Sequence, residues 1–262
     1  MAFDRSLKTT FNNVARLYDE VRPGYPEQLV GDVLSLSEIP SGGRILEIGC
    51  GPGKATIPFA KRGYSMLCLE LGEDLAALAA ENCRSYPGVE IQNIAFEDWL
   101  LQSRGFDLVI SAQAFHWIPS EIVYAKAAAS LKDTGSIALF WNHYPKLNTA
   151  FRRALNEVYK SKASRLAGSV KTMPPEELVK RTVEAINESG FFGEVVVKRY
   201  PWSEQYTADQ YIKLLNTYSD DLNLAEDTRH NLFAGVREVI ERFGGEVNRP
   251  YLAVLYFAKI KR

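Results

Sequence analysis

The sequence predicts a doubly wound α/β fold built on a mostly parallel sheet. Short apolar runs alternate with longer helix-like stretches between residues 44 and 141, and this alternation is typical of βαβ units. The runs are continuous in hydrophobicity, as strands covered on both faces should be. A glycine-rich turn follows the first run at residues 49–53, at the sheet edge where such folds bind ligands.

Seven strands are expected from the apolar runs, five of them before residue 142 and two much later in the chain. Their expected ranges are 44–49, 64–70, 89–94, 106–111, 136–141, 193–202 and 250–260. The last run, far from the others in sequence, is therefore expected to join the sheet that the early strands form.

Three crossover helices are expected between the early strands because apolar residues recur there at helical spacing. Their ranges are 55–63, 73–85 and 120–135. Further helices are expected at 147–167, at 175–189 and in a long helical region from 203 to about 243.

The irregular second half is interpreted as decoration of one domain, residues 1–262, with an N-terminal cap at 1–40. Insertions at about 147–190 and 203–245 are expected to form a helical lid over a substrate. They supply aromatic and apolar side chains for either a lid or ordinary helix packing, namely Tyr159, Met173, Tyr206, Tyr211, Tyr218 and Phe233.

Composition restricts the class of partner. The formal net charge of −1, with no basic face, argues against a nucleic-acid substrate. The cysteines, Cys50, Cys68 and Cys83, show no disulfide or metal spacing, which favours a cytoplasmic protein without a metal site. The opening residues lack a signal peptide and no run could span a bilayer, so no membrane partner is expected.

Residues 45–54, ILEIGCGPGK, carry the strongest motif. Gly49 would let the chain turn sharply off the strand, Gly51 would expose backbone to a ligand, and Gly53 would let the next helix begin close by. The dinucleotide pattern G-x-G-x-x-G does not fit after Gly53, and the triphosphate pattern fails because Ala55 cannot ligate magnesium.

The motif resembles the E-x-G-x-G-x-G turn of class I S-adenosylmethionine (SAM)-dependent methyltransferases, with Glu47, Gly49, Gly51 and Gly53 in the matching positions. The resemblance implies a Rossmann-like methyltransferase fold of seven strands, with the last strand antiparallel to the rest. It also implies that the glycine turn lies beneath the aminocarboxypropyl end of SAM.

Two other segments are similar to small-molecule methyltransferases of the trans-aconitate and ubiquinone-biosynthesis group. SAQAFHWIPSE at 111–121 looks like that group's S/A-x-x-A-x-H-W stretch. The N-terminal segment 11–30 is similar in the positions Phe11, Ala15, Tyr18, Arg22, Pro23, Tyr25 and Pro26. The likeness covers residues 11 to 141 and extends beyond them only in layout.

The resemblance assigns further residues to the cofactor site. Glu70 ends the second strand, where a carboxylate would accept hydrogen bonds from both ribose hydroxyls; the alternative is an exposed strand-end acid. Ala95 stands where the family often has a carboxylate near the adenine, so adenine recognition is expected from the backbone around Ala95 and Phe96 or from Glu97. Phe96 is equally expected as a plain core aromatic. Leu71 and Gln113 are assigned to the same site.

His116 is the candidate general base because it follows a strand that faces the cofactor and histidine titrates near neutrality. The alternative, slightly favoured, is that His116 and Trp117 shape the pocket wall. His143 and Tyr144 follow the fifth strand and could reach the ligand crevice at the carboxyl ends of the strands, although the favoured expectation is that they are solvent-facing loop residues.

Tyr18 and Arg22 are assigned to the cofactor site because they lie inside the N-terminal pattern. The arginine could pair with a carboxylate of SAM or of the substrate, or form a surface ion pair.

The expected function is methyl transfer from SAM to a small molecule, with S-adenosylhomocysteine (SAH) as the product. No Asn-Pro-Pro-Tyr or Asp-Pro-Pro-Tyr follows the fourth strand, so an oxygen or carbon nucleophile, a carboxylate among the candidates, is preferred over a base amine. The alternatives are a SAM/SAH-binding regulatory protein without methyl transfer and a nucleotide-dependent oxidoreductase. A monomer or homodimer is expected.

Overall fold

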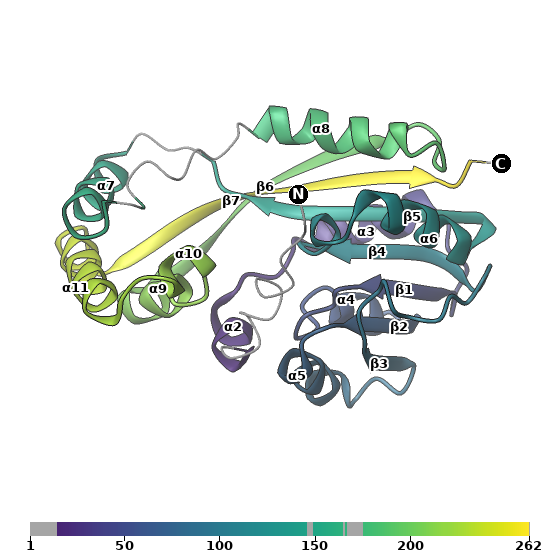
Figure 1. The fold of residues 1–262 in the computed structure, drawn as a ribbon, viewed down its shortest axis with the longest axis horizontal. Coiled ribbons are helices and arrows are strands. Elements are labelled where there is room, and N and C mark those ends of the chain that lie inside the picture. Colours follow the sequence, from purple (N-terminus) through teal and green to yellow (C-terminus); the bar gives the residue numbers. More distant parts are fainter. Residues whose placement is uncertain (1–14, 146–148, 165, 167–174, 262) are drawn as a thin grey trace.

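The computed structural model describes residues 15–145, 149–164, 166 and 175–261, and a seven-stranded sheet lies at the centre of this part (Figure 1). The strands are β1 (Arg44–Ile48), β2 (Ser65–Glu70), β3 (Val89–Asn93), β4 (Phe106–Ala112), β5 (Leu131–His143), β6 (Val196–Thr207) and β7 (Glu246–Lys259). Their order across the sheet is β3-β2-β1-β4-β5-β7-β6. Strands β1 to β5 pair in parallel, and β7 is antiparallel to both of its neighbours. The predicted mostly parallel sheet with an antiparallel last strand is confirmed.

Helices cover both faces of this sheet, as a doubly wound fold requires. On one face lie α3 (Glu27–Ser37), α4 (Thr56–Ala60) and α5 (Glu73–Cys83), which pack Val33, Phe59 and Ala79 against the apolar side chains of the strands. On the other face, α6 (Ser120–Ser130) and α8 (Pro175–Glu188) pack against a second core. Burial on both faces explains why the central strands are continuously apolar.

Strands β6 and β7 run beyond the sheet as a two-stranded ribbon that carries a group of helices. The pairing continues from Trp202 and Tyr251 to Thr207 and Glu246. The group comprises α7 (Ala150–Lys162), α9 (Ala208–Leu215), α10 (Ser219–Leu222) and α11 (Glu226–Arg242), which lie at one end of the long axis in Figure 1. It has its own apolar core, including Leu155, Leu214 and Val236.

Two sequence predictions about element boundaries are wrong. The region 203–243 is not one long helical stretch, because Ser203–Thr207 extend β6 and three helices follow. Thr207 ends the strand and starts α9 with a capping box in which its side chain accepts from the Gln210 backbone N–H. The helix predicted at 120–135 ends at Ser130, and β5 begins there because Leu131 pairs with Phe106.

Helix α2 (Ala15–Val21) and α3 occupy the segment that was predicted as an N-terminal cap, but only α2 lies over the sheet edge that carries the glycine turn. Phe11 and Met173 lie outside the described residues. No helix in the described part of the chain is long and apolar enough to cross a membrane.

Candidate active site

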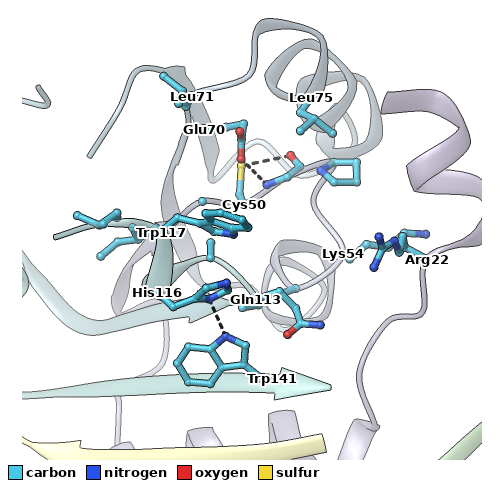
Figure 2. A pocket seen from close by; sticks show the side chains of 18 of the residues that line it. Arg22, Cys50, Lys54, Glu70, Leu71, Leu75, Gln113, His116, Trp117 and Trp141 are labelled. Carbon is cyan, nitrogen blue, oxygen red and sulfur yellow. Dashed lines mark hydrogen bonds between the residues drawn. The ribbon is translucent and has the colours of Figure 1, made fainter. Parts of the chain in front are cut away.

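A cavity of about 630 Å³ opens at the carboxyl ends of the parallel strands. It is lined by residues from α2, from the turns after β1, β2, β3 and β4, from the end of β5, and from α8. Ten of the sequence-predicted residues line it, namely Tyr18, Arg22, Gly49, Gly51, Glu70, Leu71, Ala95, Phe96, Gln113 and His116. Figure 2 shows Glu70 and Leu75 on one side of this cavity and His116 with Trp141 on the other.

The glycine turn after β1 presents bare backbone to the cavity. Gly51 has φ +55°, and no atom lies within 4 Å of the place where a Cβ would stand. Gly49 has φ +70°, and a Cβ there would lie 2.4 Å from the Ala114 Cβ. The first glycine therefore lets the turns after β1 and β4 interlock, while Gly51 leaves room for a ligand.

Two residues of the motif, Glu47 and Gly53, are not among the described residues that line the cavity, and direct contact of either with a cofactor stays a prediction. A Cβ at Gly53 would lie 3.3 Å from the Cys83 Sγ of α5, so this glycine serves helix packing. Glu47 is fully buried and accepts a hydrogen bond of 2.6 Å from the Thr56 hydroxyl. Burial raises its pKa to about 7, because a charged carboxylate is poorly solvated there.

Glu70 faces the turn, as the sequence predicts. Its Oε2 accepts a 2.8 Å hydrogen bond from the Gly51 backbone N–H, and its Oε1 accepts a 2.9 Å bond from Gly72. Burial raises the pKa of Glu70, and these backbone donors oppose the shift. Because a carboxylate has about four acceptor positions, Glu70 keeps capacity for a ligand hydroxyl.

Helix α2 is fastened over the glycine turn by three polar residues that the sequence analysis missed. Lys54 Nζ lies 3.2 Å from the Asp19 Oδ1. Asn82 donates through Nδ2 to the Asp19 Oδ2 at 3.0 Å and to the Pro52 carbonyl at 2.9 Å. No motif signals this contact, because it joins segments that are far apart in sequence.

Arg22 forms no surface ion pair with any residue in the described part of the chain, and its contacts lie inside the protein. Its Nε and Nη2 donate to the Thr217 hydroxyl and carbonyl at 2.8 and 2.7 Å. Its guanidinium carbon lies 4.9 Å from the centre of the Tyr18 ring and 4.1 Å from that of Tyr218. Figure 2 shows Arg22 and Lys54 at the same end of the cavity.

Gln113 lines the cavity in a left-handed conformation, with φ +61°. Its backbone N–H donates to the Phe140 carbonyl at 3.1 Å. A residue with a Cβ reaches this region only at a cost, so the contact with β5 holds a strained turn against the site.

His116 accepts a hydrogen bond at Nδ1 from the Trp141 Nε1, over 3.1 Å (Figure 2). Indole nitrogen only donates, so in the neutral imidazole the proton is assigned to Nε2. Burial lowers the pKa of His116 to about 4, which keeps the ring neutral near pH 7. The free ring nitrogen is therefore a donor, which weighs against a general base that would need its lone pair.

The prediction that His143 and Tyr144 are solvent-facing loop residues is wrong, because both line the cavity. His143 is the last residue of β5 and pairs with Leu252 in β7, which brings it to the ligand edge. Its Nε2 is buried without a hydrogen-bond partner in the described part of the chain, and burial lowers the pKa of His143. Trp117 also lines the cavity, with its ring centre 5.0 Å from that of His116.

Ala95 and Phe96 lie in the cavity wall after β3. Phe96 is also part of the core, where its ring stacks on Trp99 at 6.0 Å, so both interpretations of this residue hold. Among the described residues, no cluster of histidine, cysteine or acidic side chains could hold a metal ion.

The wall residues fit SAM on two observations. The space above Gly51 is open for a ligand to rest on backbone, and the Glu70 carboxylate beside it accepts hydrogen bonds. Aliphatic and aromatic surface continues from Leu71 and Leu75 to Phe96, as a planar base requires.

Sequence comparison finds a methyltransferase domain at residues 45–135. An uncharacterized methyltransferase-like protein of Schizosaccharomyces pombe is 24% identical over 257 residues, which cover 98% of this chain and 95% of that protein. A protein of Saccharomyces cerevisiae named as a probable SAM-dependent methyltransferase is 29% identical over 55% of this chain and 50% of its own length. The chain thus matches one relative throughout and about half of the other.

Shorter matches agree with the predicted subgroup. A ubiquinone biosynthesis O-methyltransferase of Methylococcus capsulatus is 30% identical over 38% of this chain and 43% of its own length. A trans-aconitate 2-methyltransferase of Variovorax paradoxus is 26% identical over 47% of this chain and 46% of its own.

Solved methyltransferases share the fold. One from Anaeromyxobacter dehalogenans superposes with a TM-score of 0.60 at 21% identity, over 91% of this chain and 96% of that one. A Haemonchus contortus phosphoethanolamine N-methyltransferase solved with SAM has a TM-score of 0.57 at 16% identity, over 100% of this chain and 60% of that one.

Proposed function

We propose that this chain, which is a class I SAM-dependent methyltransferase, transfers the methyl group to a carboxylate oxygen of a small organic acid. The observation that carries the proposal is the hydrogen bond from Trp141 to the His116 Nδ1. Because of this hydrogen bond, the imidazole that faces the cavity is neutral and donates at Nε2. Such a donor suits a methyl acceptor that already carries negative charge.

The cofactor half of the cavity is assigned to the glycine turn and its neighbours. Gly51 offers backbone to the amino-acid end of SAM, and Glu70 accepts from the ribose hydroxyls. Ala95 and Phe96 border the adenine, while Tyr18 and Gln113 close the ends of the site. When bound, SAM supplies an electrophilic methyl group on a sulfonium.

The acceptor half is assigned to the side chains beyond the β4 and β5 ends, including His116, Trp141 and Tyr144. The volume of about 630 Å³ lies within the range of roughly 300–1,000 Å³ typical of small-molecule pockets. One cavity that holds both ligands suits a small acceptor and brings the reacting atoms into contact away from bulk water.

Carboxylate methylation needs no base. The carboxylate oxygen forms a bond to the methyl carbon while the carbon–sulfur bond breaks, and the products are a methyl ester and SAH with no proton released. An anion and a cation become two neutral groups, a change that a poorly solvating cavity favours. His116 would orient the acid through its Nε2 N–H, as a positioning donor in place of the predicted base.

The names of two relatives support an oxygen acceptor. One is a ubiquinone biosynthesis O-methyltransferase, and the other is a trans-aconitate 2-methyltransferase, whose named compound is a carboxylic acid. The stretch around His116 is one of the two segments that resemble this group.

The test is an assay of methyl transfer from methyl-labelled SAM to a panel of aliphatic and aromatic acids and their amides. We expect product only from the acids, and the label should be released as methanol in mild alkali because esters hydrolyse there. Label that survives alkali would indicate an ether or a carbon–methyl bond and would contradict the proposal.

Glu70→Gln is the matched test of the cofactor half, with the exposed Glu90→Gln on β3 as its control. Loss of a charged acceptor from two ligand hydroxyls should weaken SAH binding about tenfold or more, measured by calorimetry. Equal affinity for SAH in the two variants would contradict the assignment of Glu70 to the cofactor site.

A further inference from the structure

Four tyrosines surround the guanidinium of Arg249 where β7 meets α9, α10 and the end of β5. Its Cζ lies 4.6 Å from the ring centre of Tyr144, 5.7 Å from that of Tyr211, 5.5 Å from that of Tyr218 and 5.6 Å from that of Tyr251. We call these four rings with Arg249 the tyrosine cage. Two of its members, Tyr144 and Tyr218, also line the cavity.

Among the residues that the structure describes, no carboxylate forms an ion pair with the guanidinium of the cage. The Nη1 of Arg249 is buried and has no hydrogen-bond partner, and the side chain forms no ion pair within the described ranges. The positive charge of Arg249 lowers the pKa of Asp221, but burial outweighs this effect and raises that pKa to about 7. The Asp221 Oδ1 accepts a hydrogen bond of 3.4 Å from the Tyr159 hydroxyl. A buried guanidinium without a carboxylate is costly, and aromatic faces compensate only part of that cost.

A second guanidinium stands beside the cage. Arg22 packs on Tyr218 at 4.1 Å, and its contacts with Thr217 use Nε and Nη2. Tyr218 therefore lies between two cations, and its hydroxyl contacts that of Tyr144 at 3.4 Å. Arg22, Tyr144 and Tyr218 all face the cavity, so this end of the cavity combines positive potential with hydroxyl donors.

We infer that the tyrosine cage, together with Arg22, forms the subsite for a second carboxylate of the methyl acceptor, which is therefore a dicarboxylic or tricarboxylic acid. The inference rests on the proposed function and extends it. One carboxylate lies near His116 and receives the methyl group. The other accepts hydrogen bonds from Arg22 and from the Tyr144 and Tyr218 hydroxyls, and it neutralises the charge of Arg249 behind them.

The competing occupant is the carboxylate of SAM itself. Arg22 is close to the glycine turn through α2, whereas Arg249 of β7 is not among the described residues that line the cavity and reaches it only through the rings of Tyr144 and Tyr218. A role in acceptor binding therefore predicts that Arg249 variants keep their affinity for SAH, while a role in cofactor binding predicts that they lose it.

The experiment titrates acids into protein saturated with SAH, by calorimetry. The probes are acetate, succinate, glutarate, citrate, the uncharged glutaramide and inorganic phosphate. We expect at least one di- or tricarboxylate to bind more tightly than acetate and phosphate, and glutaramide not to bind. In Arg249→Met that affinity should fall about tenfold or more, because the positive charge that the second carboxylate neutralises is lost, while affinity for SAH changes less than threefold.

Control variants distinguish a role of Arg249 in acid binding from a purely structural role. Arg242→Met removes an exposed arginine that also packs on an aromatic ring, Phe243, and should change nothing. Arg249→Lys should recover part of the affinity, and Tyr144→Phe, which keeps the ring, should lower it about threefold to tenfold. These two variants carry the test if Arg249→Met does not fold.

Three results would overturn the inference: acid binding by Arg249→Met equal to wild type, a matching loss of SAH affinity, or no polycarboxylate bound more tightly than acetate or phosphate. The proposed function fails separately. Acids that bind in the cage without forming a methyl ester would refute it and leave the subsite, whereas esters formed equally well by Arg249→Met would refute the subsite alone.

Discussion

Gly49 and Gly51 stand two residues apart in one turn, yet an added methyl group would meet different surroundings at each. At Gly49 it would collide with Ala114 in the turn after β4. At Gly51 it would enter the open cavity. The same residue type therefore serves packing at one position and ligand access at the other.

Gly49→Ala should destabilise the fold by about 1–3 kcal/mol, because it combines overpacking with a left-handed backbone. Urea unfolding measures this. Stability equal to wild type would mean that the Ala114 turn can move aside without cost.

Gly51→Ala should behave differently. Its free energy of unfolding should fall by about 1 kcal/mol for the left-handed backbone alone, but its affinity for SAH should fall about tenfold or more because the methyl group occupies ligand space. Gly63→Ala is the matched control, since Gly63 also has positive φ (+81°) and open surroundings but lies outside the cavity. Equal SAH affinity in the two variants would contradict the assignment of Gly51.

Glu47 should make stability depend on pH. Burial raises its folded-state pKa from 4.5 to about 7, so the folded protein holds a proton that the unfolded chain releases. That contribution is fully present below pH 4.5 and is lost as the pH rises through about 7.

Glu47→Gln stays neutral throughout and still accepts from Thr56. Its free energy of unfolding should therefore fall less between pH 5 and pH 8 than that of wild type, by on the order of 1–3 kcal/mol. Urea unfolding at both pH values compares the two proteins, with Glu90→Gln as an exposed control. Parallel pH profiles would place the titration of Glu47 near its ordinary range.

At the scale of elements, α2 depends on a small polar contact for its position over the glycine turn. Asp19 is the shared partner of Lys54 and Asn82. Helix α2 has only seven residues, and helices of this length are not stable by themselves. Its order therefore depends on what it docks against.

Asp19→Ala should loosen α2 and weaken SAH binding about threefold to tenfold, because a half-buried ion pair and a hydrogen bond are lost together. Hydrogen exchange of the Ala15–Val21 amides should speed up. Glu20→Ala, which breaks the exposed contact of the same helix with Lys213, is the control. Unchanged exchange in Asp19→Ala would show that other contacts hold the helix.

At the scale of the whole molecule, the sheet and the helical group are two packing units joined by the β6–β7 ribbon. The helical group closes around Gly235 of α11, where a Cβ would lie 2.9 Å from the Val158 Cγ1 of α7. The glycine turn and Glu70, to which we assign the cofactor, lie at the ends of sheet strands β1 and β2.

Gly235→Leu should therefore separate α7 from α11 and destabilise the helical group by about 1–3 kcal/mol, while affinity for SAH changes less than threefold. Ala234→Leu, at the exposed neighbouring position, is the control. Hydrogen exchange of both packing units checks the result, and an equal loss of protection in the sheet would contradict separate units.

The part of the cavity that we propose for the cofactor was predictable from sequence because local signals produce it. The glycine turn and Glu70 each follow directly from a strand end, and parallel strands bring such ends to one edge. The acceptor half was not predictable. Arg249, Tyr144 and Tyr218 come together only through the ribbon and the helices it carries, and the boundary at Thr207 depends on pairing with a strand about forty residues later.

The two parts of β7 differ in which substitutions they can tolerate. Leu252 to Lys259 of β7 pair with β5 in the sheet, whereas Val247 and Tyr251 pack in the core of the helical group. We therefore expect substitutions between Glu246 and Tyr251 to change the part of the cavity that we assign to the acceptor and to leave the glycine turn and Glu70 intact. A mutational library confined to these residues should vary acceptor selectivity at constant affinity for SAH.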